Sequence, residues 1–160
     1  MTRVNLLEAL RETTEAAVRD LRLPAYAEWE EEAAPPPVVP SVYCCRLPDE
    51  SAKTANAPYI LHQVITGKDI QRPGARPLAV TMVRSVFCVC NADGQEAGFT
   101  LLNLMEMVRR ALVVPPAIGG VFLLDRNEGV ESLVYPDDTA PFALGELIST
   151  WYVFGTEVQI

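Results

Sequence analysis

The chain has 160 residues, of which 49% are hydrophobic and 21% charged, and its formal net charge is −8 at pH 7. This length and composition fit one globular domain and argue against wholesale disorder. The acidic balance disfavours nucleic-acid binding through phosphates, which needs many lysines and arginines. The sequence contains no run of about 18 apolar residues, the length needed to span a membrane, so no membrane-spanning helix is expected. Charged residues interrupt any signal-peptide core near Glu8 and Arg11, so we expect a soluble, intracellular protein.

The charge is unevenly distributed along the chain. Residues 1–34 carry four basic and eight acidic side chains, residues 35–110 carry eight and six, and residues 111–160 carry one and seven. One interpretation is chance variation on solvated surfaces. The other is a molecule with acidic and weakly basic faces that meet on neighbouring copies.

An amphipathic helix is predicted over residues 4–22, because apolar side chains recur at three- and four-residue steps. Its N-cap is expected to be Asn5, with Glu8 completing a capping box, or alternatively Thr2. Pro24 should end the helix, since the residue before a proline is pushed out of the α region.

Residues 24–57 are predicted to form a connector with loops. An acidic cluster at 28–32 leads into four prolines between residues 35 and 40, which favour extended geometry. A short strand is expected over residues 41–47, and the polar segment 48–57 is expected to be a loop.

The middle of the chain is predicted to be β. Residues 58–66 are apolar on both faces, which is typical of a central strand, and residues 78–90 form the longest β-type run. Between them, glycines and prolines indicate a long hairpin loop over residues 67–77. The loop carries three basic residues, Lys68, Arg72 and Arg76, and one interpretation is a solvated, flexible hairpin.

A second helix is predicted over residues 100–113, with Thr100 as its cap and Phe99 packed on Leu104 as a hydrophobic staple. Three further strands are expected at 121–124, 130–135 and 145–154. The element order predicts an α+β fold in a single domain, residues 1–160, with two main helices packed on a mostly antiparallel sheet of about four to six strands.

The sequence contains few candidate catalytic residues. The single histidine, His62, lies inside an apolar strand, which is typical of a core or interface residue, although a dyad with a cysteine is an alternative. Cys44 and Cys45 are adjacent and Cys88 and Cys90 are two apart, so neither pair has the spacing of a zinc site. We expect Cys88 and Cys90 to be buried on one face of their strand. No catalytic residue and no cofactor is predicted.

Acidic residues cluster in predicted turns, where aspartate and asparagine are favoured by turn geometry alone. They do not have the spacing of a calcium loop, so no metal site is predicted. These clusters consist of Asp125, Glu128 and Glu131, of Asp137 and Asp138, and of Asn91, Asp93 and Glu96. Trp29 and Trp151 are candidate packing or interface anchors.

The segment from Ala79 to Tyr152 resembles a known family. A β run ending in VFCVCN is followed by DGQEAG, by LLNLMEMVRRAL, by IGGVFLL, by VESLVYPDDTAPF and by the closing strand GELISTWYV. This order is similar to that of prophage-encoded proteins related to phage tail terminator, or tail completion, proteins. The helix and the E-x-x-S-T-W strand are the most specific parts of the resemblance, which covers roughly the second half of the chain.

The resemblance implies a structural virion protein with no active site. Members of the family cap the head-proximal end of a phage tail as a ring, usually hexameric, at the head–tail joint. The implied partners are further copies of the chain, the tail tube protein and a head-completion or connector protein. On this interpretation Lys68, Arg72, Arg76 and Trp151 are the candidate interface residues. A head-completion protein on the portal side and, from another class, a cytoplasmic ligand-binding module are the alternatives.

Overall fold

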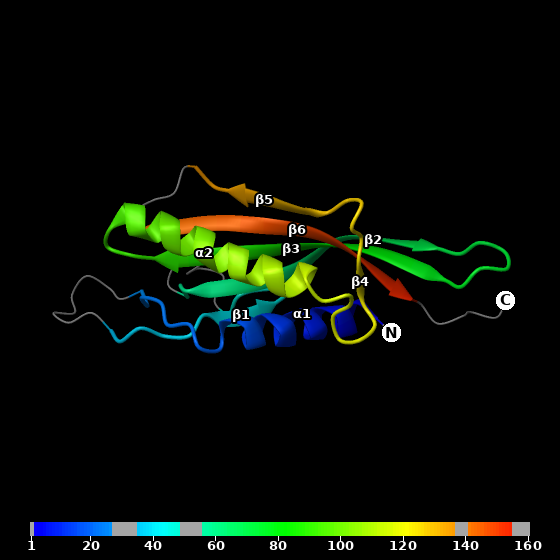
Figure 1. Cartoon of the computed structure of the whole chain (residues 1–160), viewed down its shortest axis with the longest axis horizontal. Coiled ribbons are helices and arrows are strands. Elements are labelled where there is room, and N and C mark those ends of the chain that lie inside the picture. Colours follow the sequence, from blue (N-terminus) through cyan, green and yellow to red (C-terminus); the bar gives the residue numbers. More distant parts are fainter. Residues whose placement is uncertain (1, 27–34, 49–55, 137–140, 155–160) are drawn as a thin grey trace.

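The computed structural model describes residues 2–26, 35–48, 56–136 and 141–154, and within them the chain folds as an α+β domain. Figure 1 shows one curved sheet with both helices on one side of it. The elements in chain order are α1 (Arg3–Val18), β1 (Ser41–Cys44), β2 (Tyr59–Ile70), β3 (Leu78–Cys90), α2 (Gly94–Val113), β4 (Leu123–Leu124), β5 (Val130–Val134) and β6 (Phe142–Phe154).

The sheet has six strands in the order β1-β2-β3-β6-β4, and β5 also pairs with β6. All pairs are antiparallel except β1 with β2, which is parallel. The predicted fold class, a mostly antiparallel sheet of four to six strands with two helices, is therefore confirmed. The long central strands β3 and β6 pair along their whole length, from Leu78 opposite Phe154 to Cys90 opposite Phe142.

Helix α1 begins at Arg3, one residue before the predicted start. Thr2 is the N-cap, and Asn5 is the third helical residue of the capping box, so the alternative cap was right and Asn5 as cap was wrong. The helix ends at Val18 rather than at residue 22. The reason is that Leu23 forms two backbone hydrogen bonds with Val38, of 2.8 and 2.9 Å, which require extended backbone before Pro24.

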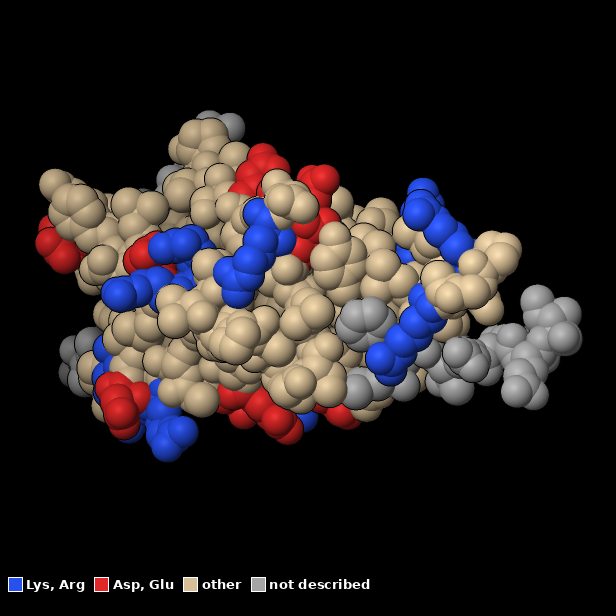
Figure 2. Space-filling view, turned by 45° about the vertical axis from the view of Figure 1, so that its right-hand side comes forward, with Lys and Arg blue, Asp and Glu red and all other residues tan. Residues whose placement is uncertain are grey.

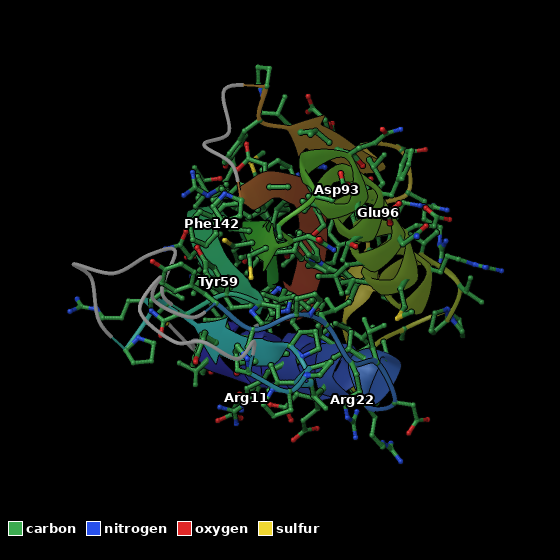
Figure 3. All side chains as sticks on the ribbon, turned by 90° about the vertical axis from the view of Figure 1, so that its left-hand side faces the viewer. Arg11, Arg22, Tyr59, Asp93, Glu96 and Phe142 are labelled. Atoms are coloured by element: carbon green, nitrogen blue, oxygen red, sulfur yellow. The ribbon has the colours of Figure 1, made fainter. Side chains whose placement is uncertain are left out.

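Helix α2 also begins earlier, at Gly94 instead of residue 100. The Asp93 side chain accepts hydrogen bonds from the backbone N–H groups of Gln95 and Glu96, so Asp93 is the N-cap. The prediction of Thr100 as the cap, with Asp93 in a preceding turn, was wrong. Figure 3 shows Asp93 and Glu96 at this end of the helix. The proposed staple is wrong, because Phe99 lies inside the helix with 51% of its surface exposed.

Several strand boundaries differ from the predicted ones. Strand β1 ends at Cys44 rather than at residue 47, and β4 covers only Leu123–Leu124 of the predicted 121–124. Strand β2 runs to Ile70, so the loop predicted at 67–77 is confined to residues 71–77, and Lys68 lies in a strand. Strand β6 starts at Phe142 rather than 145, because it pairs with β3 as far as Cys90. Cross-strand partners determine these boundaries, and they are remote in sequence.

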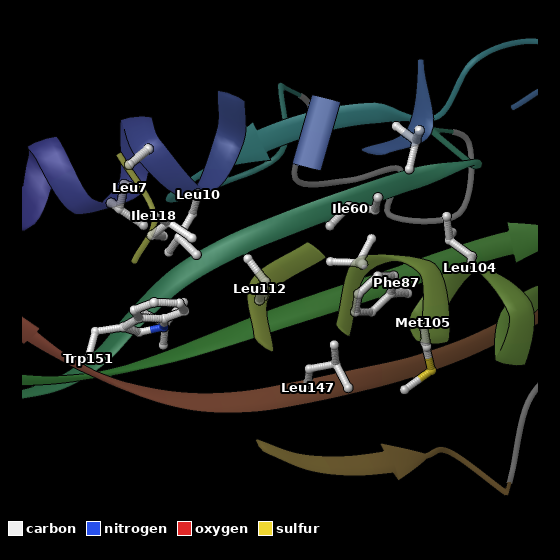
Figure 4. Packing of buried hydrophobic residues seen from close by; sticks show 14 of the residues in the cluster. Leu7, Leu10, Ile60, Phe87, Leu104, Met105, Leu112, Ile118, Leu147 and Trp151 are labelled. Atoms are coloured by element: carbon white, nitrogen blue, oxygen red, sulfur yellow. The ribbon is translucent and has the colours of Figure 1, made fainter. Parts of the chain in front are cut away.

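The main core lies between the helices and the sheet, where Leu10 of α1, Leu104 of α2, Phe87 of β3 and Trp151 of β6 are all within 1% of full burial. Figure 4 shows this layer. Apolar residues at the 3.6-residue period of the helices pack against apolar residues at alternate positions of the strands, so this face of the sheet is shielded from water.

A smaller core covers part of the opposite face of the sheet. Cys88 and Cys90 are both buried there beside Tyr59, which confirms the expected shared face of the two cysteines. Tyr26 packs against Phe142, with ring centroids 5.0 Å apart and ring planes tilted by 48°, and both side chains lie against this cluster. The rest of this face has no helix over it in the described chain.

Gly145 allows helix α2 and strand β5 to approach β6 closely. A Cβ atom at this position would lie 2.8 Å from Met105 Sδ and 3.0 Å from the Leu133 carbonyl oxygen. We expect Gly145→Ala to lower the free energy of unfolding by about 1–3 kcal/mol, because both neighbours must move. Gly98→Ala is the matched control: nothing lies within 4 Å of its Cβ, and alanine in a helix should stabilise slightly. Urea unfolding measures both, and an unchanged Gly145→Ala variant would contradict the close packing.

Candidate assembly surface

A hairpin arm, residues 65–77, extends beyond the body of the domain (Figure 1). Strand β1 pairs with β2 only from Tyr59 to His62, so the outer edge of β2 beyond this point has no neighbouring strand in the described chain. Residues 65–69 are all exposed. Ile65 lies at a break in the register with β3 and is 46% exposed. Such a bare edge is a template for a further protein segment.

Arg3 braces the arm against the body. Its Nε donates to Thr81 Oγ1 at 3.1 Å, and its Nη2 forms an ion pair with Asp69 at 3.1 Å. The guanidinium crosses Gly67, where a Cβ would be 2.5 Å from it, so a side chain at position 67 would displace the guanidinium. The arm therefore leaves the domain in a defined direction.

The predicted basic residues lie on this arm. Lys68 is in β2, while Arg72 and Arg76 are in the loop, and all three are exposed. Figure 2 shows basic side chains at this end of the molecule. No described residue forms an ion pair with Lys68 or Arg72, so both charges are available to a partner.

Trp151, the fourth predicted interface residue, is not on the surface. It is completely buried in the middle of β6, and its Nε1–H donates to Ser149 Oγ at 2.8 Å. Its interface role is corrected to the packing role that the sequence also allowed, because position 151 alternates toward the helices. Trp29 lies outside the described residues.

A second exposed strand edge lies at β5, at the opposite edge of the sheet from the hairpin arm. We call residues 128–134 the β5 edge. Leu133 is 50% and Val134 43% exposed, on opposite faces of the strand, and β5 has β6 as its only strand neighbour in the described chain. Glu128 and Glu131 are exposed on the same edge, and neither forms an ion pair with a described residue. Sequence analysis missed this edge, because a short strand does not reveal which side it leaves unpaired.

The carboxylate of Asp125 organises the turn that leads into the β5 edge. The Tyr152 hydroxyl donates to Asp125 Oδ2 at 2.7 Å, and Oδ1 accepts the backbone N–H groups of Asn127 and Glu128. The hydrogen bond from Tyr152 contributes most to lowering the pKa of Asp125, and the two backbone hydrogen bonds lower it further.

In the described residues no group of three or more His, Cys, Asp or Glu could hold a metal. Asp137 and Asp138 lie outside those residues.

A row of polar side chains crosses the helix-free face of the sheet. Arg84 Nε lies 3.4 Å from Glu146 Oε2, and Arg84 Nη2 donates to Gln63 Oε1 at 3.2 Å. Gln63 in turn donates to the Cys45 carbonyl at 3.0 Å. This row ties β2, β3 and β6 together and separates the covered small core from the open part of the face.

His62 is a structural residue that joins α1 to the sheet. It is completely buried, with Nε2 2.9 Å from Thr14 Oγ1 and Nδ1 2.7 Å from Ser85 Oγ, and both hydroxyl residues are buried too. Burial lowers the pKa of His62 to about 4, so the imidazole is neutral at pH 7. In a neutral ring one nitrogen donates to a hydroxyl and the other accepts from one.

The thiols of Cys44 and Cys88 are not activated. Cys44 is the register partner of His62, and burial raises the pKa of Cys44. Cys88 lies in the small core on the opposite face of the sheet, and burial raises its pKa to about 12. A nucleophilic cysteine needs a lowered pKa, so these cysteines do not fit the dyad considered as an alternative.

Comparison of the chain with protein-family models and with curated proteins gave no match. No helix in the described part of the chain is long and apolar enough to cross a membrane. The candidate site consists of two strand edges without a neighbouring strand in the described chain, which are the basic hairpin arm and the acidic β5 edge.

Proposed function

We propose that this protein is a structural subunit of a phage tail, which assembles into a ring and caps the head-proximal end of the tail at the head–tail joint. The proposal rests on the resemblance of residues 79–152 to tail terminator proteins and is supported by the α+β fold. The protein would act by shape, with further copies of itself, the tail tube protein and a head-completion or connector protein as partners.

The observation that carries the proposal is the difference between the two edges of the sheet. The hairpin arm is basic and the β5 edge is acidic, and each exposes large apolar side chains, Ile65 on one and Leu133 and Val134 on the other. Exposed apolar strand residues are unfavourable in a free monomer and favour burial against a partner. Two different edges on one chain suit a head-to-tail contact, which closes into a ring when the rotation allows it.

The test is whether the protein forms rings and stops tail-tube growth. We expect native mass spectrometry and negative-stain electron microscopy of the wild-type chain to show a closed ring, hexameric by the resemblance. Added to polymerising tail tube protein, the chain should shorten the tubes. The double variant R72E/R76E should impair both results while its melting temperature stays within about 2 °C of the wild type, because exposed charges contribute little to stability.

A control variant, E12K/R19E, reverses the exposed charges of Glu12 in α1 and of its C-cap residue Arg19, and should assemble normally. Tubes that grow to the same length with and without the wild-type chain would contradict a terminator role. Binding to a portal or connector ring instead of to the tube would favour the alternative, a head-completion protein.

A further inference from the structure

The two bare edges cannot satisfy each other within one subunit. The hairpin arm belongs to β2 and the β5 edge pairs with β6, and β3 lies between β2 and β6 in the sheet. The complementary charges of Lys68 and Glu131 are therefore held apart by the fold. A partner for each edge has to come from another molecule.

The residues on the two edges match in one antiparallel register. If Lys68 is opposite Glu131, then Ile65 is opposite Val134, and the loop residue Arg72 comes beside Glu128, two residues before β5 begins. Opposite charges and apolar side chains in facing positions each stabilise a strand pair. The free backbone groups of both strands would then be paired as well.

We propose that the hairpin arm of one copy docks along the β5 edge of the next copy, with Lys68 and Arg72 of the first facing Glu131 and Glu128 of the second. This inference deepens the proposed function and rests on it, because it names the contact by which the ring closes. The Arg3 brace supports it, since an arm held in one direction loses less conformational freedom on docking.

The experiment uses two charge-reversed full-length chains, K68E/R72E and E128K/E131K. Neither should assemble alone, because each places like charges across the contact, and we expect association to weaken by about tenfold or more. A 1:1 mixture should restore rings in which the two chains alternate, since every contact is again complementary. Native mass spectrometry resolves the two chains by mass and should show equal numbers of each in every ring, as alternation requires.

The combined variant K68E/R72E/E128K/E131K carries both reversals in one chain and should form rings by itself. Thermal melting checks that all variants are folded, and E12K/R19E serves again as the control for charge changes elsewhere. Hydrogen exchange should also slow at residues 65–70 and 130–134 when the wild-type ring forms.

The outcomes separate this contact from the proposed function. If the wild type forms rings and caps tubes but either double variant assembles equally well, the contact is wrong and the function stands. If the mixture and the combined variant stay monomeric while folded, the contact is also wrong. A wild-type chain that never forms a ring, alone or on tail tubes, overturns both.

Discussion

Replacing Trp151 with alanine is expected to lower the free energy of unfolding by about 3–5 kcal/mol, the usual cost of removing a large buried aromatic side chain. Trp151 is completely buried, and it lies in the main core on the helix side of the sheet. Figure 4 shows its indole on the same side of β6 as Leu147 and Phe87. Urea unfolding followed by circular dichroism measures the change.

Trp151→Phe is the matched control for this effect. It keeps most of the apolar contact but removes the Nε1–H that donates to Ser149 Oγ, so the loss should be smaller, about 1–3 kcal/mol. If Trp151→Ala cost less than about 1 kcal/mol and instead blocked ring formation, the indole would have to be at an interface, and its assignment to the core would fail.

Acid should destabilise the protein through His62. The unfolded chain binds a proton at this residue below about pH 6.5, whereas the folded chain does so only near pH 4. The unfolded state therefore carries the extra proton between these values, so stability falls as the pH decreases. From about pH 7.5 to pH 4 this group alone should remove roughly 3 kcal/mol, and above pH 7.5 its effect should be flat.

The variant His62→Gln isolates this effect from the titration of carboxylates. Its amide can still bond the hydroxyls of Thr14 and Ser85, but it cannot take up a proton. The free energy of unfolding, measured by urea at several pH values, should fall less steeply for the variant between about pH 6.5 and 4. Equal slopes would mean that His62 is protonated in the folded protein, contrary to its complete burial.

For His62, the local sequence predicts the kind of environment but not the hydrogen-bond partners. A lone histidine in an apolar strand predicted a core or interface residue, and the structure places His62 in the core. Its partners, Thr14 and Ser85, are 48 and 23 residues away in sequence, so no local pattern could identify them. The sequence could not decide between core and interface for Trp151, because the helix residues that share its core are remote in sequence.

Local patterns in the chain were enough to predict both helices, the long hairpin, the α+β class and the burial of Cys88 and Cys90, because periodicity and helix breakers act over a few residues. Contacts between distant segments decided the rest. Pairing with Val38 ended α1 early, pairing with β3 lengthened β6, and the strand order placed a basic arm and an acidic edge on opposite sides of one sheet. The candidate assembly surface exists only in that arrangement, since the free edge of a strand is defined by the neighbours it lacks.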